Sequence, residues 1–346
     1  MKTAIIGASG YAGEETVRIL SRHPRLQLAA VTSRQFKGKT LGGVVGGLTR
    51  NRDLVFEDLS PEQVASRADL FVLAVPHGVA SEYAVPLRQA GKLVVDLSAD
   101  YRLRDAAVYE EFYGHPHPAP ALLQEAVYGM PELHAAAIRK ADLIASPGCY
   151  PTSILLALAP ALRAGLLDLE TISISSMSGV TGAGKKAEIP LLFGEVGESL
   201  RAYGIPKHRH LSEIEQELGL LAGKPVRVGF VPHLVPMNRG IHTTITARLV
   251  QAPGSGTAAQ IQSQIQGLYE AAYRETPFVR VLDAATLPEV KNVARTNFAE
   301  IALRVDSRTG RLILLSAIDN LVKGTAGQAV QAINLRLGWP ETEGLL

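Results

Sequence analysis

One segment of the sequence places a reactive residue type where its chemistry could be activated. Cys149, the only cysteine, stands in Ser-Pro-Gly-Cys-Tyr-Pro-Thr, after a short apolar run and before a helix predicted for residues 153–162. Backbone N–H groups at a helix N-terminus stabilise a thiolate and lower its pKa, and they could also stabilise an oxyanion on a bound carbonyl. The position predicts a nucleophilic cysteine, and a buried, inert cysteine is the alternative.

A second segment could move protons. His210 and Glu213 are three residues apart at the start of a predicted helix, which Ser212 and Glu215 would cap as a capping box. A carboxylate bonded to one ring nitrogen would fix the histidine tautomer and leave the other nitrogen for proton transfer. A basic surface turn explains the same residues equally well. His208 and His210 alone are too few ligands for a metal, so no metal is expected.

A glycine-rich turn opens the chain. It joins a strand predicted for residues 3–8 to a helix predicted for residues 11–22, with the spacing G-x-x-G-x-x-G. Such a turn lets the backbone approach a pyrophosphate, and the helix N-terminus attracts the negative charge. A plain tight turn is the alternative. We expect cofactor contacts from Gly7, Ser9, Gly10, Tyr11, Ala12 and Gly13.

The end of the second predicted strand bears on the choice of cofactor. Ser33 and Arg34 stand where an enzyme selecting NAD commonly has an acid for the ribose 2′-hydroxyl. An acid would repel a 2′-phosphate, whereas these two side chains could bind it, so we expect NADP. Arg34 as an ordinary surface charge is the alternative. We also expect cofactor contacts from residues that follow other predicted elements further along the chain: Pro76, His77, Ser98, Asn320 and Gly324.

Two further segments could bind an anion. The Gly/Ser/Thr-rich loop 178–186 lacks the P-loop spacing, so it predicts anion binding rather than nucleotide hydrolysis, with a flexible turn as the alternative. Arg102 follows the fourth predicted strand, where an α/β sheet places its ligand. It could clamp a carboxylate or phosphate, or it could only pair with Asp100.

The elements that must position these residues divide the chain. Apolar strands alternate with helices in the first half, which predicts a Rossmann-type, doubly wound parallel sheet. Its strands are expected at 3–8, 26–32, 70–75, 93–97 and 143–145, with a second helix at 79–89, and the segments 37–52 and 113–120 are expected to be surface loops.

The second half predicts an α+β domain with a mainly antiparallel sheet. Strands are expected at 171–177, 226–231, 241–249, 299–305 and 311–317, with a hairpin turn at 306–310 and a helix at 258–274. A last helix, predicted at 324–337, would pack on the first domain. We therefore expect a cofactor domain of residues 1–147 and 320–346 and a catalytic and dimerisation domain of residues 148–319.

The composition excludes several classes of protein. The 35 Lys and Arg nearly balance the 33 Asp and Glu, and there is no basic run, so we expect no nucleic-acid partner. One cysteine excludes an intrachain disulfide and a cysteine-cluster metal site, and it fits a reducing compartment. The apolar runs are too short for a signal peptide or a membrane span, so we expect a cytoplasmic protein.

Several stretches together resemble one family. GASGYAGEE, LSADYRL, SPGCYPTS, SGVTGAGKK, KHRHLSEIEQ, PHLVPMNRG and DNLVKGTAGQAVQ follow in family order from residue 7 to about 331. They are similar to the N-acetyl-γ-glutamyl-phosphate reductases of arginine biosynthesis, relatives of aspartate-semialdehyde dehydrogenase. The resemblance implies a Rossmann domain, an α/β catalytic domain, NADP as cofactor, an acyl-phosphate substrate and a homo-oligomer, either dimer or tetramer.

The resemblance also implies a mechanism. The Cys149 thiolate would attack the acyl phosphate and release phosphate, and NADPH would reduce the thioester to an aldehyde. His210 would handle the proton, and Glu213 would orient or tune His210. Substrate contacts are expected from Arg102, Ser178, Gly179, Gly182 and His208. A paralogue that reduces a carrier-protein-bound aminoadipyl or glutamyl phosphate and a catalytically inactive NADP-binding regulator are the alternatives.

Overall fold

A computed structural model describes residues 1–250 and 257–346. The chain forms two compact units, one of residues Met1–Pro147 and Thr325–Leu346 and the other of residues Gly148–Gly324. The sequence-based division places its second boundary at residue 320 rather than 325. Within the residues described, no helix has both the length and the apolar composition needed to cross a membrane.

The first unit is built on a parallel sheet, as predicted. Its order is β3-β2-β1-β4-β5-β7-β6, and each pair of neighbours is parallel. The inner strands are runs of apolar residues because both faces of the sheet are covered. The strands are β1 (Lys2–Ile6), β2 (Gln27–Thr32), β3 (Phe56–Glu57), β4 (Leu70–Leu73), β5 (Leu93–Asp96), β6 (Val127–Tyr128) and β7 (Leu143–Ala145).

Helices cover both faces of this sheet. Helices α1 (Tyr11–Leu20), α7 (Pro131–Ile138) and α13 (Gly327–Arg336) share one core with alternate strand residues. Helices α3 (Pro61–Ala65) and α4 (Ala80–Gln89) share the other core with the remaining strand residues. The doubly wound arrangement is thus confirmed, and the last helix of the chain belongs to it. Three shorter helices complete the unit: α2 (Leu41–Val44), α5 (Ala106–Tyr113) and α6 (Pro120–Glu125).

The two segments predicted as surface loops are partly buried, so that prediction is wrong in part. Helix α2 lies inside segment 37–52, and Leu41 and Val45 enter the core. In segment 113–120, His117 is buried and its Nε2–H donates to the Asp100 carbonyl at 2.8 Å. A glycine- or proline-rich composition marks irregular backbone, but it does not prevent an apolar or hydrogen-bonded side chain from turning inward.

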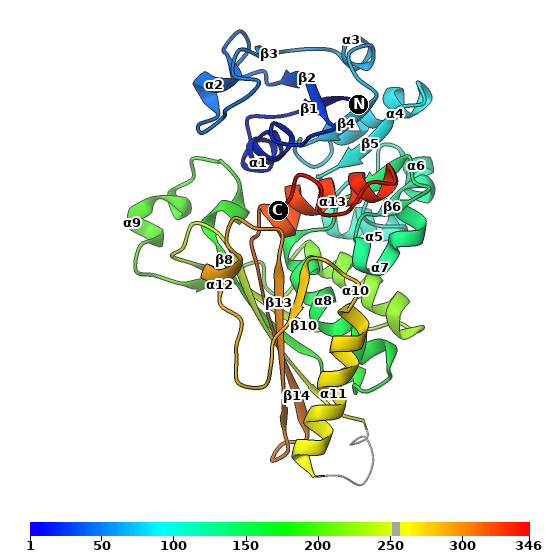
Figure 1. Cartoon of the computed structure of the whole chain (residues 1–346), viewed down its shortest axis with the longest axis vertical. Helices are drawn as coiled ribbons and strands as arrows, with labels where there is room; N and C mark the ends of the chain where they lie inside the picture. The colour runs from blue at the N-terminus through cyan, green and yellow to red at the C-terminus, as the bar shows by residue number, and fades with distance from the viewer. Residues whose placement is uncertain (251–256) are drawn as a thin grey trace. The chain divides into compact units, whose positions relative to one another are not determined.

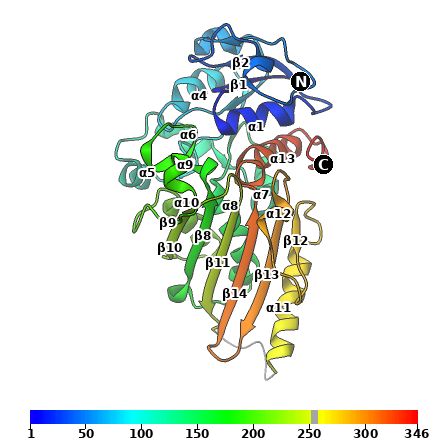
Figure 2. The ribbon, with the colours of Figure 1, turned by 90° about the vertical axis from the view of Figure 1, so that its left-hand side faces the viewer.

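The second unit contains a mixed sheet, whose central strands Figure 2 shows side by side. Its order is β12-β13-β14-β11-β8-β10-β9. The predicted hairpin forms, with antiparallel β13 and β14, and β11 continues the antiparallel pairing to β14 and β8. The strands are β8 (Ser173–Gly179), β9 (Arg201–Ala202), β10 (Gly229–Val235), β11 (Ile241–Arg248), β12 (Val279–Val281), β13 (Ala299–Asp306) and β14 (Arg311–Ile318).

The sheet is mainly antiparallel, as predicted: four of its six strand pairs are antiparallel, and β10–β8 and β12–β13 are parallel. One strand boundary differs from the prediction. The strand predicted at 226–231 begins only at Gly229, because the Val228 N–H donates to the Glu215 carboxylate at 3.2 Å instead of joining the ladder. The Glu215 side chain thus accepts a backbone N–H that the sequence pattern had predicted to pair with a neighbouring strand.

Helices α8 (Cys149–Arg163) and α11 (Ala258–Tyr273) pack on one face of the sheet, and α10 (His210–Ala222) packs on α8. Figures 1 and 2 show α11 running beside β13. Buried hydroxyls fix α8 to the sheet: Ser153 Oγ lies 2.8 Å from Thr243 Oγ1 and 2.7 Å from Ser316 Oγ. Because buried polar groups are costly unless paired, these contacts specify how the helix that begins at Cys149 lies on the sheet.

The remaining elements are short. They are the 3₁₀ turns η1 (Leu169–Thr171), η2 (Val180–Ala183) and η3 (Ile189–Leu191), helices α9 (Phe193–Val196) and α12 (Val290–Val293), and the π-helical turn η4 (Val322–Ala326).

Candidate active site

The glycine-rich turn of the first unit is as tight as its sequence indicates. Gly7 has φ +81°, and a Cβ built there would lie 2.4 Å from the Ala74 carbonyl oxygen. A Cβ at Gly13 would lie 2.4 Å from the Gly7 carbonyl oxygen, so helix α1 presses directly on the turn. Gly10 is the N-cap of α1 and offers no side chain to cap it. The turn therefore brings backbone N–H groups and the positive end of a helix to one place.

Ser9 and Ser33 meet beside this turn. Their Oγ atoms lie 2.9 Å apart, and the Thr32 Oγ1 accepts the Gly7 N–H at 3.1 Å, so the end of β2 is tied to the turn. Arg34 extends outward, with 80% of its side chain exposed and Asp58 at 3.9 Å. A charged side chain that is both exposed and weakly paired keeps its capacity to bind an anion.

The other predicted cofactor residues of this unit lie near the carboxyl ends of β4 and β5. His77, next to Pro76, accepts the Ala99 N–H on Nδ1 at 3.0 Å, and its ring packs edge-on against Tyr113. Ser98 is buried and its hydroxyl donates to Asp96 at 2.8 Å. These contacts fix the loops after both strands, which is the edge where doubly wound sheets bind ligands.

Two buried aspartates stand at the same edge. Burial raises the pKa of Asp96 to about 7, and the charge of Asp100 adds to the rise. The Asp100 carboxylate accepts the Gly78 N–H at 2.8 Å and the Ala80 N–H at 3.2 Å, which caps the start of α4. Arg102 is also buried and donates to the carbonyl oxygens of Ser146 and Leu97 at 2.7 and 3.0 Å. These bonds hold Arg102 within the first unit.

Cys149 is the first residue of helix α8, four positions before the predicted helix start. Its N-cap is Gly148, which has extended backbone angles and no side chain to compete for the helix N–H groups. The cysteine itself is half-buried. The Gly148 N–H donates to Glu213 Oε1 at 2.7 Å, and that glutamate is only 2% exposed. A buried carboxylate from α10 therefore holds the residue directly before the cysteine.

Helix α10 begins at His210, so His210 and Glu213 share its first turn. The predicted capping box of Ser212 and Glu215 is wrong. Ser212 Oγ donates to the Arg209 carbonyl, and Glu215 forms an ion pair with Arg227. The His208 Nδ1 instead accepts the His210 N–H at 3.1 Å and does the work of a cap.

Aromatic rings surround these histidines. The His208 ring lies 5.0 Å from that of His210 and packs edge-on against Tyr150 and Tyr203. Burial lowers the pKa of His208 to about 4, with the nearby Arg209 charge adding to the effect. His208 is therefore neutral at physiological pH, with Nδ1 as an acceptor.

Two tyrosines of this cluster were not predicted. The hydroxyls of Tyr150 and Tyr203 are hydrogen-bonded at 2.8 Å, and burial raises the pKa of Tyr203 to about 12. The Tyr150 ring also lies 5.9 Å from that of His210. The position of Tyr150 directly after Cys149 could have indicated that it belongs to the site. Tyr203 stands in a segment whose sequence gives no sign of a site.

The predicted anion loop is ordered by backbone contacts at its start. A Cβ at Gly179 would lie 2.8 Å from the backbone of Asn238, and one at Gly182 would lie 2.9 Å from Ser178 Oγ. Thr181 donates to the Asn238 carbonyl through its hydroxyl at 2.6 Å. Glycine at Gly179 is thus needed for close backbone approach, and the start of the loop is held by defined contacts.

Asn320 and Gly324, predicted to contact the cofactor, lie in the second unit. Asn320 is buried, its Oδ1 accepts the Gly240 N–H at 2.8 Å, and its Nδ2 donates to Thr181 at 3.0 Å. A Cβ at Gly324 would lie 2.7 Å from the Cβ of Cys149. In the described part of the chain, no group of three or more His, Cys, Asp or Glu side chains could hold a metal ion.

Known domain families match both halves of the chain. Residues 2–141 match the NAD binding domain of semialdehyde dehydrogenases, and residues 149–320 match their dimerisation domain. The fold agrees: aspartate semialdehyde dehydrogenase II from Vibrio cholerae, complexed with ASA, superposes with a TM-score of 0.73 over 97% of this chain and 98% of that one, at 18% identity. The enzyme with NADP from Candida albicans gives 0.70 over 97% and 98%, at 17% identity. The two domain matches place the chain in the semialdehyde dehydrogenase family, and the fold agrees.

Curated relatives narrow this class. N-acetyl-gamma-glutamyl-phosphate reductases from Akkermansia muciniphila and Geobacter sp. strain M21 are each 50% identical to this chain, over all of it and 98% of the relative. The same enzyme from Moorella thermoacetica is 48% identical over the same shares. The chain belongs to the N-acetyl-gamma-glutamyl-phosphate reductase family.

Proposed function

We propose that this chain reduces N-acetyl-L-glutamyl 5-phosphate to N-acetyl-L-glutamate 5-semialdehyde with NADPH and releases phosphate. Family membership supports the overall reaction. The observation that carries the residue assignment is the 2.7 Å hydrogen bond from the Gly148 N–H to Glu213. It ties the start of α8, which bears the nucleophile, to the first turn of α10, which bears the acid–base histidine.

Cys149 is the proposed nucleophile. Its place in the first turn of α8 favours the thiolate, and helix N–H groups can stabilise the oxyanion that forms when the thiolate attacks the acyl carbon. The bond between the acyl carbon and the phosphate oxygen then breaks, which leaves a thioester on Cys149. His210 protonates the carbonyl oxygen during the reduction and takes that proton back when the hemithioacetal collapses to the aldehyde and the thiolate.

The first unit is the proposed cofactor domain. The Gly7–Gly13 turn fits a dinucleotide, because glycine at Gly7 and Gly13 is required for the close packing seen there and Gly10 leaves the helix start uncapped. Bound NADPH would supply the hydride for reduction of the thioester. Ser33 and the exposed Arg34 are the proposed contacts of the 2′-phosphate. The KM for NADPH should lie well below that for NADH, and the reverse order would contradict this assignment.

The proposed substrate contacts are Arg102, Ser178, Gly179, Gly182 and His208. Support is strongest for the loop, where Gly179 lies against the backbone of residues 238–239, and for His208, whose ring lies beside that of His210. A homo-oligomer, dimer or tetramer, is also proposed from the matched dimerisation domain. Light scattering of the purified protein tests the assembly, and a monomer at micromolar concentration would contradict it.

The test of the reaction is the reverse assay with N-acetylglutamate semialdehyde, NADP and phosphate, followed by formation of NADPH. Cys149→Ser should abolish turnover while NADP binding by calorimetry is unchanged. Because the chain has a single cysteine, iodoacetamide labelling reports on Cys149 alone. An inactive wild type would refute the proposed function, and full activity of Cys149→Ser would refute the nucleophile.

A further inference from the structure

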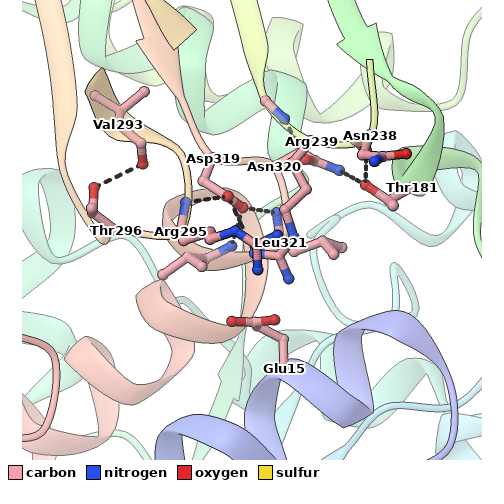
Figure 3. Close-up of polar contacts among 12 residues, drawn as sticks. Glu15, Thr181, Asn238, Arg239, Val293, Arg295, Thr296, Asp319, Asn320 and Leu321 are labelled. Carbon is pink, nitrogen blue, oxygen red and sulfur yellow. Dashed lines mark hydrogen bonds and ion pairs between the residues drawn. The ribbon is translucent and has the colours of Figure 1, made fainter. Parts of the chain in front are cut away.

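Asp319 joins three separate segments of the second unit. Its carboxylate is fully buried and accepts four donors: Arg239 Nη1 at 3.2 Å, the Arg295 N–H at 2.6 Å, and the N–H groups of Leu321 and Val322 at 2.8 and 2.9 Å. Figure 3 shows Asp319 among Arg239, Arg295 and Leu321. One buried charge thus has an opposite charge and three backbone donors, which is the condition under which a buried carboxylate is stable.

One of these donors is held in an unusual conformation. Arg295 has φ +65°, the left-handed region that residues with a Cβ rarely adopt. The donor is its backbone N–H, and no side-chain role is needed to explain the contact. Surrounding structure must hold such a conformation, and here the short bond to Asp319 acts together with the hydrogen bonds from Thr296 to the Val293 carbonyl.

The turn that Asp319 caps reaches the nucleophile. The Gly324 N–H donates to the Asp319 carbonyl at 2.9 Å, which closes the turn of residues 319–324. A Cβ at Gly324 would lie 2.7 Å from the Cβ and 3.2 Å from the Cα of Cys149. Carbon atoms in contact normally stand about 3.5–4.0 Å apart. There is therefore no room for a side chain at Gly324, and the backbone of this turn packs directly against Cys149.

The adjoining residue connects the same turn to the proposed substrate loop. Asn320 binds the Gly240 N–H and Thr181 Oγ1, and Thr181 in turn donates to the Asn238 carbonyl. Figure 3 shows Arg239, Asn320 and Thr181 meeting beside Asp319. The turn that packs against Cys149 and the proposed substrate loop are therefore both bonded to the buried residues Asp319 and Asn320.

From these contacts we propose that Asp319 is a positioning residue for Cys149. Its carboxylate fixes the turn of residues 321–324 against the nucleophile and holds Arg239 and the Arg295 segment behind it. The inference deepens the proposed function and rests on it, because it assumes that Cys149 performs the reaction. Asp319 itself touches neither the reacting atoms nor the cofactor in this proposal.

Two variants test the proposal. Asp319→Asn keeps the size of the side chain but turns an NH₂ group toward donors on one side. Gly324→Ala removes none of the donors to the Asp319 carboxylate, and its Cβ would press directly on Cys149. Both should lower kcat by about 10- to 100-fold, the effect of displacing a catalytic group by up to about 1 Å. Asp319→Asn should change the KM for NADP by less than about twofold. Both should also slow iodoacetamide labelling of Cys149 and raise the pH at which labelling reaches half its maximum rate.

The matched control is Gly267→Ala on α11, where an added Cβ meets no atom within 4 Å. It should keep the wild-type labelling rate and kcat. If Asp319→Asn does not fold, Gly324→Ala still tests the contact between the turn and Cys149. Arg239→Met then tests whether the bonds of the Asp319 carboxylate hold that turn in place. Arg239→Met should lower kcat in the same direction by a smaller factor. Wild-type labelling profiles and kcat in Asp319→Asn and Gly324→Ala would overturn the proposal.

Labelling also separates this inference from the proposed function. It needs neither substrate nor NADP, so it reports the position and ionisation of Cys149 whatever the reaction is. An inactive wild type whose labelling slows in both variants would refute the proposed function and support the positioning role. If the wild type is active and neither variant changes the labelling rate or kcat, the proposed function is supported and the positioning role is refuted.

Discussion

Replacing Glu213 distinguishes two roles for this carboxylate. The sequence predicts that it orients or tunes His210, whereas the structure shows it bonded to the Gly148 N–H at 2.7 Å and buried to 2% exposure. Glu213→Gln keeps an oxygen that can accept this N–H but removes the charge. Glu213→Ala removes the acceptor and leaves the buried N–H without its partner.

The expected magnitudes follow from that bond. A hydrogen bond to a charged group contributes about 1.5–3 kcal/mol and a neutral one about 0.5–1.5 kcal/mol, so Glu213→Gln should cost roughly 1 kcal/mol, or about fivefold. An unsatisfied buried N–H together with the lost side-chain packing should make Glu213→Ala cost about 2–4 kcal/mol. If Glu213 acts mainly by holding the elbow, kcat should fall by about fivefold in the first variant and by at least a further tenfold in the second.

The assay is the reverse reaction across pH, with urea unfolding of each variant in parallel. A fall of kcat by only about fivefold in Glu213→Gln, with an unchanged pH profile of kcat, is the expected result. An equal and large loss of kcat in both variants, together with a shifted pH profile, would refute the reasoning. It would show that the charge of Glu213 acts on His210 and that the bond to Gly148 is secondary.

Three further predictions follow from charge and burial. Because burial holds the pKa of His208 at about 4, below the 6.5 of the unfolded chain, the unfolded state binds more protons between these values; urea unfolding should show stability rising from pH 4 to 6.5 by up to about 3 kcal/mol, and His208→Gln should lack this rise. The pKa of Asp96 is raised to about 7, so the folded state binds the extra proton between pH 3.8 and 7 and loses stability as the pH rises through that window; Asp96→Asn should therefore unfold at higher urea than wild type above pH 7, and a lower midpoint would contradict the buried, costly charge. Arg34→Ala should raise the KM for NADPH by about tenfold and leave the KM for NADH within about twofold, whereas equal changes would exclude a 2′-phosphate contact.

The sequence predicted elements best where local pattern and tertiary burial agree. Leu143–Ala145 and the strands of the β13–β14 hairpin are apolar or alternating runs bounded by turn residues, and the structure places them within a residue or two of prediction. Strands β3 and β6 have two residues each and were missed. Such short edge strands are defined by the partner that they meet, not by their own composition.

Site predictions failed where a side chain from elsewhere took over a local role. The Ser212 capping box looked complete in sequence, but the helix begins at His210, whose N–H is accepted by the ring of His208. Glu215, the expected partner, is drawn to Arg227 and Val228. Asp319 is similar, since its donors come from segments up to 80 positions away. Spacing along the chain cannot reveal such contacts, because they depend on which loops the sheet brings together.

The order of the two units along the chain has a consequence for how this molecule is made. The second unit is one uninterrupted stretch, Gly148–Gly324, inserted into the first. The core of the first unit is closed by Val330 and Ile333 of α13, which are synthesised after the whole insert. On the ribosome, the insert can therefore finish folding before α13 covers its part of one apolar face of the host sheet, on which α1 and α7 also lie. A chaperone that binds nascent chains should therefore contact the part of this sheet that α13 later covers. It should do so after residue 147 leaves the ribosome and before α13 does.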